Sequence, residues 1–211
     1  MQKGMLLYTF IDGAYLNGRT PRDVAKALVD GGSDIIQLRL KKADAAEVRR
    51  VAEEVLPLTQ AVGVPLVIND FPDVAEAVGA EFVHLGQEDF FDNHYTHVSE
   101  VIRKRRFRVG LSSHAPEQAL AAVRAGAAYL GVGPVFPTQT KPTATPVTLE
   151  YVRWASHNLT IPWFAIGGIN LDNLGQVLDA GASGICVVSD ILNAPDIAAR
   201  CQQYKKRMSA G

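Results

Sequence analysis

The chain has 211 residues, of which 47% are hydrophobic, and its formal net charge is −1. The near-neutral charge excludes the basic surface that nucleic-acid-binding proteins present, and the apolar content excludes a largely disordered chain. The length predicts one domain over residues 1–211, with a core large enough to fold without disulfide staples.

The N-terminal apolar stretch ends at Asp12, and no cleavage site of small residues follows it. We therefore interpret it as a first β-strand rather than a signal peptide. No run of roughly 18 apolar residues occurs, so no membrane span is predicted. The two cysteines, Cys186 and Cys201, are too few for a disulfide framework. These features predict a cytoplasmic protein without a nucleic-acid or membrane partner, and they leave its oligomeric state open.

Eight short apolar runs follow one another along the chain, and several come shortly after a helical segment that ends in glycine. Glycine closes a helix by adopting the left-handed conformation, and a fully apolar run is typical of a parallel strand that is buried on both faces. The predicted strands are 5–11, 34–39, 65–69, 82–85, 108–112, 129–132, 163–166 and 184–188. Helical periodicity marks 44–62, 115–125, 170–180 and 194–208, and the candidate helix starts are Thr20-Pro21, Ala43-Asp44 and Ser189-Asp190.

Eight β–α units in a chain of this length predict an α/β fold, a single-domain (β/α)8 TIM barrel. An open, doubly wound sheet is the alternative, and the lack of a GxGxxG motif after the first strand favours the barrel. Barrels of this kind carry their chemistry at the C-terminal face. The polar residues at the strand ends are therefore the candidates for a site.

The second predicted strand ends in three polar side chains, Gln37, Arg39 and Lys41, which point to the same side because strand side chains alternate. Two cations on one face of a buried strand are costly unless an anion meets them. Salt bridges to neighbouring carboxylates are one explanation. We favour an anion-binding site, because three polar residues in register at a strand end are rarer than one stray ion pair.

Two carboxylates follow the next two strands, Asp70 after Asn69 and Asp89 after the fourth strand. Two carboxylates beside two cations suit a Mg²⁺ ion that bridges to phosphate oxygens. The alternative for Asp70 is a helix cap before Phe71. His84, on the fourth strand, is interpreted as a structural core histidine.

The later strands supply candidate phosphate ligands. The fifth strand ends at Ser112, and the long loop 134–146 contains Thr138, Thr140 and Lys141, with an inert surface loop as the alternative. Gly168 after the seventh strand and Ser189 after the eighth are typical of the phosphate cup of such barrels, with a tight turn as the alternative. A phosphate cup opposite a diphosphate-like site suggests a transferase that joins two phosphorylated small molecules.

At this point the chain resembles the thiamine-phosphate synthase (thiamine-phosphate pyrophosphorylase) family. The resemblance runs from Gln37 to Ser189, and the segments that carry it are QLRLK (37–41), PLVIND (65–70), VHLGQED (83–89), GLSSH (110–114), YLGVGPVFPTQTK (129–141), AIGGI (165–169) and VVS (187–189). Each segment alone is a weak signal, and their order and their positions at strand ends make the combination specific.

The resemblance implies a Mg²⁺-dependent condensation of 4-amino-2-methyl-5-(diphosphooxymethyl)pyrimidine with a thiazole phosphate, giving thiamine phosphate and pyrophosphate through a dissociative step. The residues that it places on the pyrimidine diphosphate are Gln37, Arg39, Lys41, Asn69, Ser112 and Lys141. Of these, Arg39, Lys41, Lys141 and Ser112 are the candidate catalytic residues. Asp70 and Asp89 would hold Mg²⁺. The thiazole phosphate would be held by Thr138, Thr140, Gly168, Val188 and Ser189.

The chain departs from the family pattern at three places: Leu40 replaces an acidic residue, Thr148 stands where glycine is frequent, and segment 90–97 is unusual. Three alternatives stay open. A thiazole tautomerase of the same barrel family would use His114 as its acid–base group. A sugar-phosphate isomerase or epimerase would leave the diphosphate site unexplained. A non-catalytic ligand-binding barrel would bind without turnover.

Overall fold

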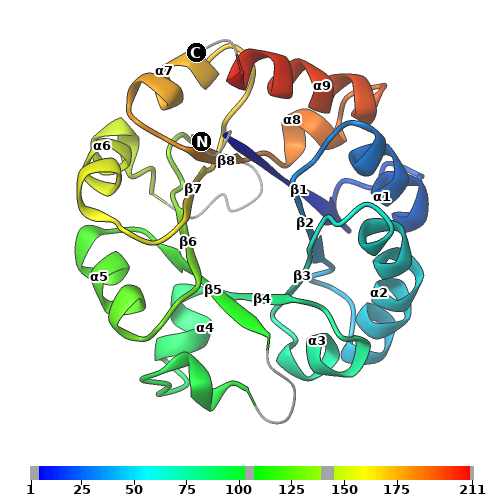
Figure 1. The fold of residues 1–211 in the computed structure, drawn as a ribbon, viewed down its shortest axis with the longest axis horizontal. Helices are drawn as coiled ribbons and strands as arrows, with labels where there is room; N and C mark the ends of the chain where they lie inside the picture. The colour runs from blue at the N-terminus through cyan, green and yellow to red at the C-terminus, as the bar shows by residue number, and fades with distance from the viewer. Residues whose placement is uncertain (1–4, 103–106, 139–144, 210–211) are drawn as a thin grey trace.

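The computed structural model describes residues 5–102, 107–138 and 145–209. Eight parallel strands close into a barrel in chain order, and the last strand pairs with the first (Figure 1). The predicted (β/α)8 barrel is therefore confirmed. The strands are β1 (Leu6–Asp12), β2 (Ile35–Arg39), β3 (Leu66–Asn69), β4 (Phe82–Leu85), β5 (Arg108–Ser113), β6 (Tyr129–Val132), β7 (Trp163–Ile166) and β8 (Gly184–Cys186).

The helices form a ring outside the strands (Figure 1). They are α1 (Pro21–Asp30), α2 (Ala45–Gln60), α3 (Pro72–Val78), α4 (Gln87–Phe91), α5 (Pro116–Arg124), α6 (Thr148–Asn158), α7 (Leu174–Asp179), α8 (Ser189–Leu192) and α9 (Ile197–Met208), with a 3₁₀ turn at Val98–Glu100. No helix in the described ranges is long and apolar enough to cross a membrane.

Two of the three predicted helix starts are confirmed. The Thr20 side chain accepts a hydrogen bond from the Asp23 backbone N–H at the start of α1, and Asp44 accepts one from Glu47 at the start of α2. The third is wrong as a cap, because Ser189 is already the first residue of α8. The predicted eighth strand is also too long. The backbone leaves the extended conformation at Val188, which has φ −111° and ψ −85°.

Aromatic rings fill the barrel interior. Phe164 meets Tyr8 and Tyr129 edge-on, at ring-centroid distances of 5.2 and 5.7 Å. Gly110 makes room for this packing, since a Cβ there would lie 2.1 Å from the Tyr129 ring. These large buried rings leave the hydroxyl groups of Tyr8 and Tyr129 inside the barrel, where each needs a hydrogen-bond partner.

Candidate active site

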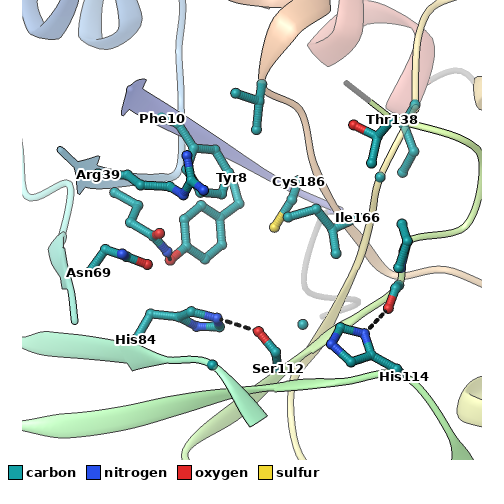
Figure 2. Close-up of a pocket in the computed structure, with 18 of the residues that line it drawn as sticks. Tyr8, Phe10, Arg39, Asn69, His84, Ser112, His114, Thr138, Ile166 and Cys186 are labelled. Atoms are coloured by element: carbon teal, nitrogen blue, oxygen red, sulfur yellow. Dashed lines mark hydrogen bonds between the residues drawn. The ribbon is translucent and has the colours of Figure 1, made fainter. Parts of the chain in front are cut away.

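A cavity of about 440 Å³ opens within the barrel, among the strand ends and the loops that follow them (Figure 2). Of the thirteen predicted site residues, Thr140 and Lys141 lie outside the described residues. The other eleven all line this cavity: Gln37, Arg39, Lys41, Asn69, Asp70, Asp89, Ser112, Thr138, Gly168, Val188 and Ser189. Residues from both ends of the sequence thus reach one space, as a closed barrel requires.

Two cations at the end of β2 lie beside carboxylates. Arg39 is the last residue of the strand, whereas Lys41 already lies in the following turn, so the predicted strand register does not extend to it. Arg39 Nη1 lies 2.6 Å from Asp12 Oδ2, and Lys41 Nζ lies 2.5 Å from Asp70 Oδ2. The salt bridges that were the alternative to an anion site are therefore present, and Asp12 is a partner that the sequence analysis missed. The Asp12 carboxylate is anchored as well, because its Oδ1 accepts a hydrogen bond from the Ala14 backbone N–H at 2.9 Å.

The two candidate metal ligands approach the cavity from different elements. Asp70 follows β3 in the left-handed conformation, with φ 65°, which is rare outside glycine and is often stabilised at functional sites. The helix-cap alternative for Asp70 is wrong, because Phe71 occupies the cap position of α3 without a side-chain bond. Asp89 lies in the first turn of α4. Its carboxylate packs closely against Gly86, since a Cβ added to Gly86 would lie 2.5 Å from Asp89 Oδ2.

A chain of hydrogen bonds joins five side chains inside the cavity. Gln37 Nε2 donates to the Tyr8 hydroxyl at 2.6 Å, and the hydroxyls of Tyr8 and Tyr129 lie 2.9 Å apart. The Tyr129 hydroxyl is 3.1 Å from His84 Nδ1, and His84 Nε2 is 3.0 Å from Ser112 Oγ (Figure 2). The network links two predicted substrate ligands, Gln37 and Ser112, through three residues that were not predicted as part of the site.

The same network keeps its members uncharged at neutral pH. Burial lowers the pKa of His84 to about 4, and the positive charges of Lys41 and Arg39 add to this effect while Asp89 opposes it. Burial also raises the pKa of the Tyr8 and Tyr129 hydroxyls well above their usual range. The histidine therefore carries one ring proton, with one nitrogen as donor and the other as acceptor.

His84 is not simply a core residue, as the sequence analysis had it, because its ring lines the cavity. A signal for the missed residues was available in the strand period. Side chains two residues apart on one strand face the same side, so Tyr8 shares a face with Phe10, and Tyr129 shares one with Gly131. The prediction considered polar residues at the strand ends only, so it missed those within the strands whose side chains face the same interior.

The opposite side of the cavity is built by the turn after β7. Gly167 and Gly168 both have positive φ, and a Cβ on Gly168 would lie 2.5 Å from the Pro137 carbonyl oxygen. The backbone of Phe136 donates to the Gly167 carbonyl at 3.1 Å, so the loop after β6 packs on this turn. Glycine is therefore needed for the turn itself, which was the alternative explanation, and the same packing brings Thr138 beside the proposed phosphate cup.

A shallower hollow of about 480 Å³ continues outward from this end of the cavity. It shares Thr138, Gly168 and Ser189 with the cavity and adds Arg200, whose Nη1 lies 3.0 Å from Asp190 Oδ2. The end of the cavity beside Gly168 and Ser189 thus opens toward solvent through a wall that contains a second guanidinium.

His114 also lines the cavity, from the end of β5. Its Nδ1 contacts the Gly133 carbonyl oxygen (Figure 2), which can only accept, so Nδ1 carries the proton. Its Nε2 is buried and has no hydrogen-bond partner among the described residues. A neutral His114 therefore presents an unused lone pair.

Two of the departures from the family pattern have structural explanations. Thr148 has φ 62°, a conformation that glycine adopts without strain, and this accounts for the frequent glycine of the family. Within segment 90–97, the buried Phe90 ring lies 4.9 Å from the ring of Phe91 and 5.5 Å from that of Tyr95. The unusual residues there thus include an aromatic cluster formed by the last two residues of α4 and by Tyr95, which follows it.

Comparisons with known proteins show which family and which proteins the chain is similar to. The family model described as thiamine monophosphate synthase matches residues 7–191. The chain is 45% identical over 194 residues to a thiamine-phosphate synthase of Thermus thermophilus, covering 90% of this chain and 87% of that protein. It is 41% identical over 201 residues to a thiamine-phosphate synthase of Halalkalibacterium halodurans, covering 94% of this chain and 92% of that protein.

Solved structures give the same result for the fold. The structure of thiamine phosphate pyrophosphorylase from Pyrococcus furiosus superposes with a TM-score of 0.86 and 32% identity, covering 98% of this chain and 96% of that one. A tryptophan synthase structure from Mycobacterium tuberculosis reaches a TM-score of 0.75 at only 15% identity, over 99% of this chain and 94% of that one, and shows the shared barrel alone.

Proposed function

Because the chain belongs to the thiamine monophosphate synthase family, we propose that it is a thiamine-phosphate synthase, a transferase that joins a pyrimidine diphosphate to a thiazole phosphate. The observation that supports this most directly is the convergence of eleven predicted ligands on one cavity. The phosphorylated substrates differ in charge, and the cavity offers Arg39 and Lys41 at the end of β2 and a glycine turn after β7 to match them.

The first substrate is 4-amino-2-methyl-5-(diphosphooxymethyl)pyrimidine. Its diphosphate lies against Arg39 and Lys41, with Lys141 contributed by the loop after β6, and its ring lies among Gln37, Asn69 and Ser112. The bond between the methylene carbon and the diphosphate oxygen breaks first, and the electron pair leaves with pyrophosphate. The cations oppose the charge that builds on this leaving group. The electron-rich aminopyrimidine carries the positive charge that remains on the methylene carbon.

The second substrate is a thiazole phosphate. Its phosphate lies in the cup formed by Gly168, Val188 and Ser189, with Thr138 and Thr140 from the loop. The ring nitrogen attacks the methylene carbon and forms the new C–N bond of thiamine phosphate. Holding both rings face to face in one cavity supplies much of the acceleration, so the enzyme needs no nucleophile of its own.

The acidic residues fit a Mg²⁺ ion. Within the described ranges there is no group of three or more His, Cys, Asp or Glu side chains that could hold a metal. Mg²⁺ is typically held by one or two carboxylates together with substrate phosphates and waters, so a pair of aspartates that line one cavity is a suitable set. Asp70 and Asp89 would hold the ion, and bound Mg²⁺ would offset the charge of the diphosphate.

The test is a direct assay. The purified protein is mixed with both phosphorylated precursors and Mg²⁺, and thiamine phosphate is followed by oxidation to its fluorescent thiochrome, with a parallel sample in EDTA. We expect product only in the sample with metal. Calorimetric binding of the precursors with no product would instead identify a non-catalytic ligand-binding barrel, and product in EDTA would remove the metal from the proposal.

A second candidate function has one observation in its favour. The unpaired Nε2 of His114 is placed to accept a proton, as the acid–base group of a thiazole tautomerase would have to do. Isomerisation of the carboxylated thiazole phosphate alone, without the pyrimidine, would identify this activity. The names of the similar proteins favour the synthase.

A further inference from the structure

The network of Gln37, Tyr8, Tyr129, His84 and Ser112 is more than a set of separate contacts, because each hydroxyl has a single proton to give. Gln37 Nε2 donates to Tyr8, so the Tyr8 proton must go elsewhere. The other partner of the Tyr8 hydroxyl in the described structure is the Tyr129 hydroxyl. A Tyr8 hydroxyl that uses its proton within the network donates it to Tyr129.

The donors further along the network are fixed in the same way. Tyr129 accepts from Tyr8 and so gives its own proton to Nδ1 of His84. A neutral imidazole that accepts at Nδ1 carries its proton at Nε2, which then donates to Ser112 Oγ. The Ser112 proton is left over, and so is the carbonyl oxygen of the Gln37 side chain. Both residues line the cavity.

We propose that these five side chains act as one directional relay, which holds Gln37 as an acceptor and Ser112 as a donor for the bound substrate. Tyr8, Tyr129 and His84 are positioning residues in this scheme. The inference rests on the proposed function, and it adds how the site recognises the ring of its substrate. The relay selects a heteroaromatic ring that offers a donor to one end and an acceptor to the other, as an amino group and a ring nitrogen of an aminopyrimidine do.

The relay also makes its two ends interdependent. If the side chain at position 37 could only accept from Tyr8, every proton in the chain would have to reverse. Tyr129 would then donate to Tyr8, His84 would donate from Nδ1 to Tyr129, and Ser112 would donate to His84 Nε2. Ser112 would face the substrate as an acceptor, although neither its position nor its identity had changed.

The tautomer of His84 reports this direction without any turnover. We expect ¹⁵N NMR of the ligand-free protein at neutral pH to show the proton of His84 on Nε2. Gln37→Glu, which accepts from Tyr8, should move the proton to Nδ1. Adding Tyr129→Phe to that variant cuts the relay, and the His84 signals should then match those of Tyr129→Phe alone. A proton on Nδ1 in the wild type, or a tautomer that ignores Gln37→Glu, would overturn the relay.

Binding of the pyrimidine diphosphate alone, measured by calorimetry, tests the consequence for recognition. Tyr129→Phe keeps the ring and should weaken binding about tenfold, the usual effect of one lost hydrogen bond. In a Ser112→Ala background the same change should cost clearly less, because one of the two ends that the relay holds is already gone. Additive losses in the double variant would contradict the proposal.

Tyr151→Phe is the matched control. Tyr151 is a buried tyrosine whose hydroxyl donates to the Ala115 carbonyl at 2.9 Å, and it does not line the cavity. Its variant should bind the pyrimidine diphosphate like the wild type, and equal weakening in both tyrosine variants would count against the relay. If the thiochrome assay shows no synthesis while the His84 tautomer follows position 37, the relay stands and only the proposed function fails.

Discussion

At the residue scale, the two ion pairs at the end of β2 differ in how firmly they are held. The side chains of Asp12 and Arg39 are only 2% and 20% exposed, so this pair is largely shielded from water. Lys41 is 48% exposed beside Asp70, and exposed pairs of this kind contribute roughly 0–1 kcal/mol. Arg39 is therefore a fixed cation of the cavity wall. Lys41 and Asp70 separate at little cost, which leaves each able to take a phosphate or a metal instead.

The metal assignment leads to a prediction for Asp89. Asp89→Asn removes a charge from the proposed Mg²⁺ site while keeping the size of the side chain. We expect the Mg²⁺ concentration for half-maximal synthesis to rise about tenfold, which corresponds to a loss of about 1.4 kcal/mol. Asp92→Asn is the control, because Asp92 is exposed three residues further on and does not line the cavity. Equal Mg²⁺ curves for both variants would remove Asp89 from the site.

Thr148 gives a prediction for stability. Its left-handed backbone, with φ 62°, costs a residue with a Cβ about 1–2 kcal/mol relative to the ordinary helical region. Thr148→Gly should therefore be more stable than Thr148→Ala by about 1 kcal/mol, since both variants lose the hydroxyl that accepts from the Glu150 N–H. Urea unfolding of the pair measures the difference. If the alanine variant were as stable as the glycine variant, the position would carry no strain.

At the scale of elements, the turn after β7 connects two parts of the site. Gly168→Ala should lower the free energy of unfolding by about 2 kcal/mol, because the new Cβ meets the Pro137 carbonyl at a strained φ. The substitution should also raise the KM for the thiazole phosphate, because it distorts the proposed phosphate cup. The KM for the pyrimidine diphosphate should stay nearly unchanged. Steady-state kinetics in each substrate distinguish the two effects.

Gly175→Ala is the matched control for that turn. Gly175 lies in α7, where an added Cβ meets no atom within 4 Å. Gly175 lies in the first turn of this helix, where alanine should stabilise the protein by up to about 0.5–1 kcal/mol and leave both KM values unchanged. A larger KM for the thiazole phosphate in this variant as well would show that the effect of Gly168→Ala is not local to the cup.

The elements themselves were largely readable from the sequence, because the parallel strands are short apolar runs and several of them follow a helix that ends in glycine. Predicted and observed strands differ mainly at ends that depend on partners. β1 extends to Asp12 because that residue pairs in register with Arg39 of β2, which no local pattern reveals. In the same way, α7 starts only at Leu174, because the Asn170 side chain accepts from the backbone of Asp172 and Asn173 and holds a turn there.

The contacts between side chains of different strands could not be predicted from the sequence. Strand ends indicated Gln37 and Ser112, whose residue types and positions are local features. The link between them runs through Tyr8 and Tyr129, which are 121 residues apart, and it exists only once the barrel closes. The pairing of Arg39 with Asp12 depends on the same closure, so the charge balance of the cavity was misjudged even though its lining was located.

At the scale of the whole molecule, the relay makes barrel stability depend on pH. It joins side chains of β1, β2, β4, β5 and β6, and His84 stays neutral in the folded state because its pKa falls from 6.5 to about 4. The unfolded chain binds a proton at His84 below about pH 6.5, whereas the folded barrel binds it only near pH 4. The contribution of His84 is therefore complete above pH 6.5 and is lost progressively as the pH falls toward 4.

The expected loss between about pH 7 and pH 5 is roughly 2 kcal/mol in the free energy of unfolding, measured by urea denaturation without ligands. His84→Gln cannot titrate and should show a pH slope smaller by that amount. His157→Gln, which changes an exposed histidine on α6, should keep the wild-type slope. If all three proteins lost stability in parallel, His84 would have to protonate as readily in the barrel as in the unfolded chain. A barrel interior in which His84 becomes charged so readily could not keep the imidazole neutral, with the single ring proton on which the direction of the relay depends.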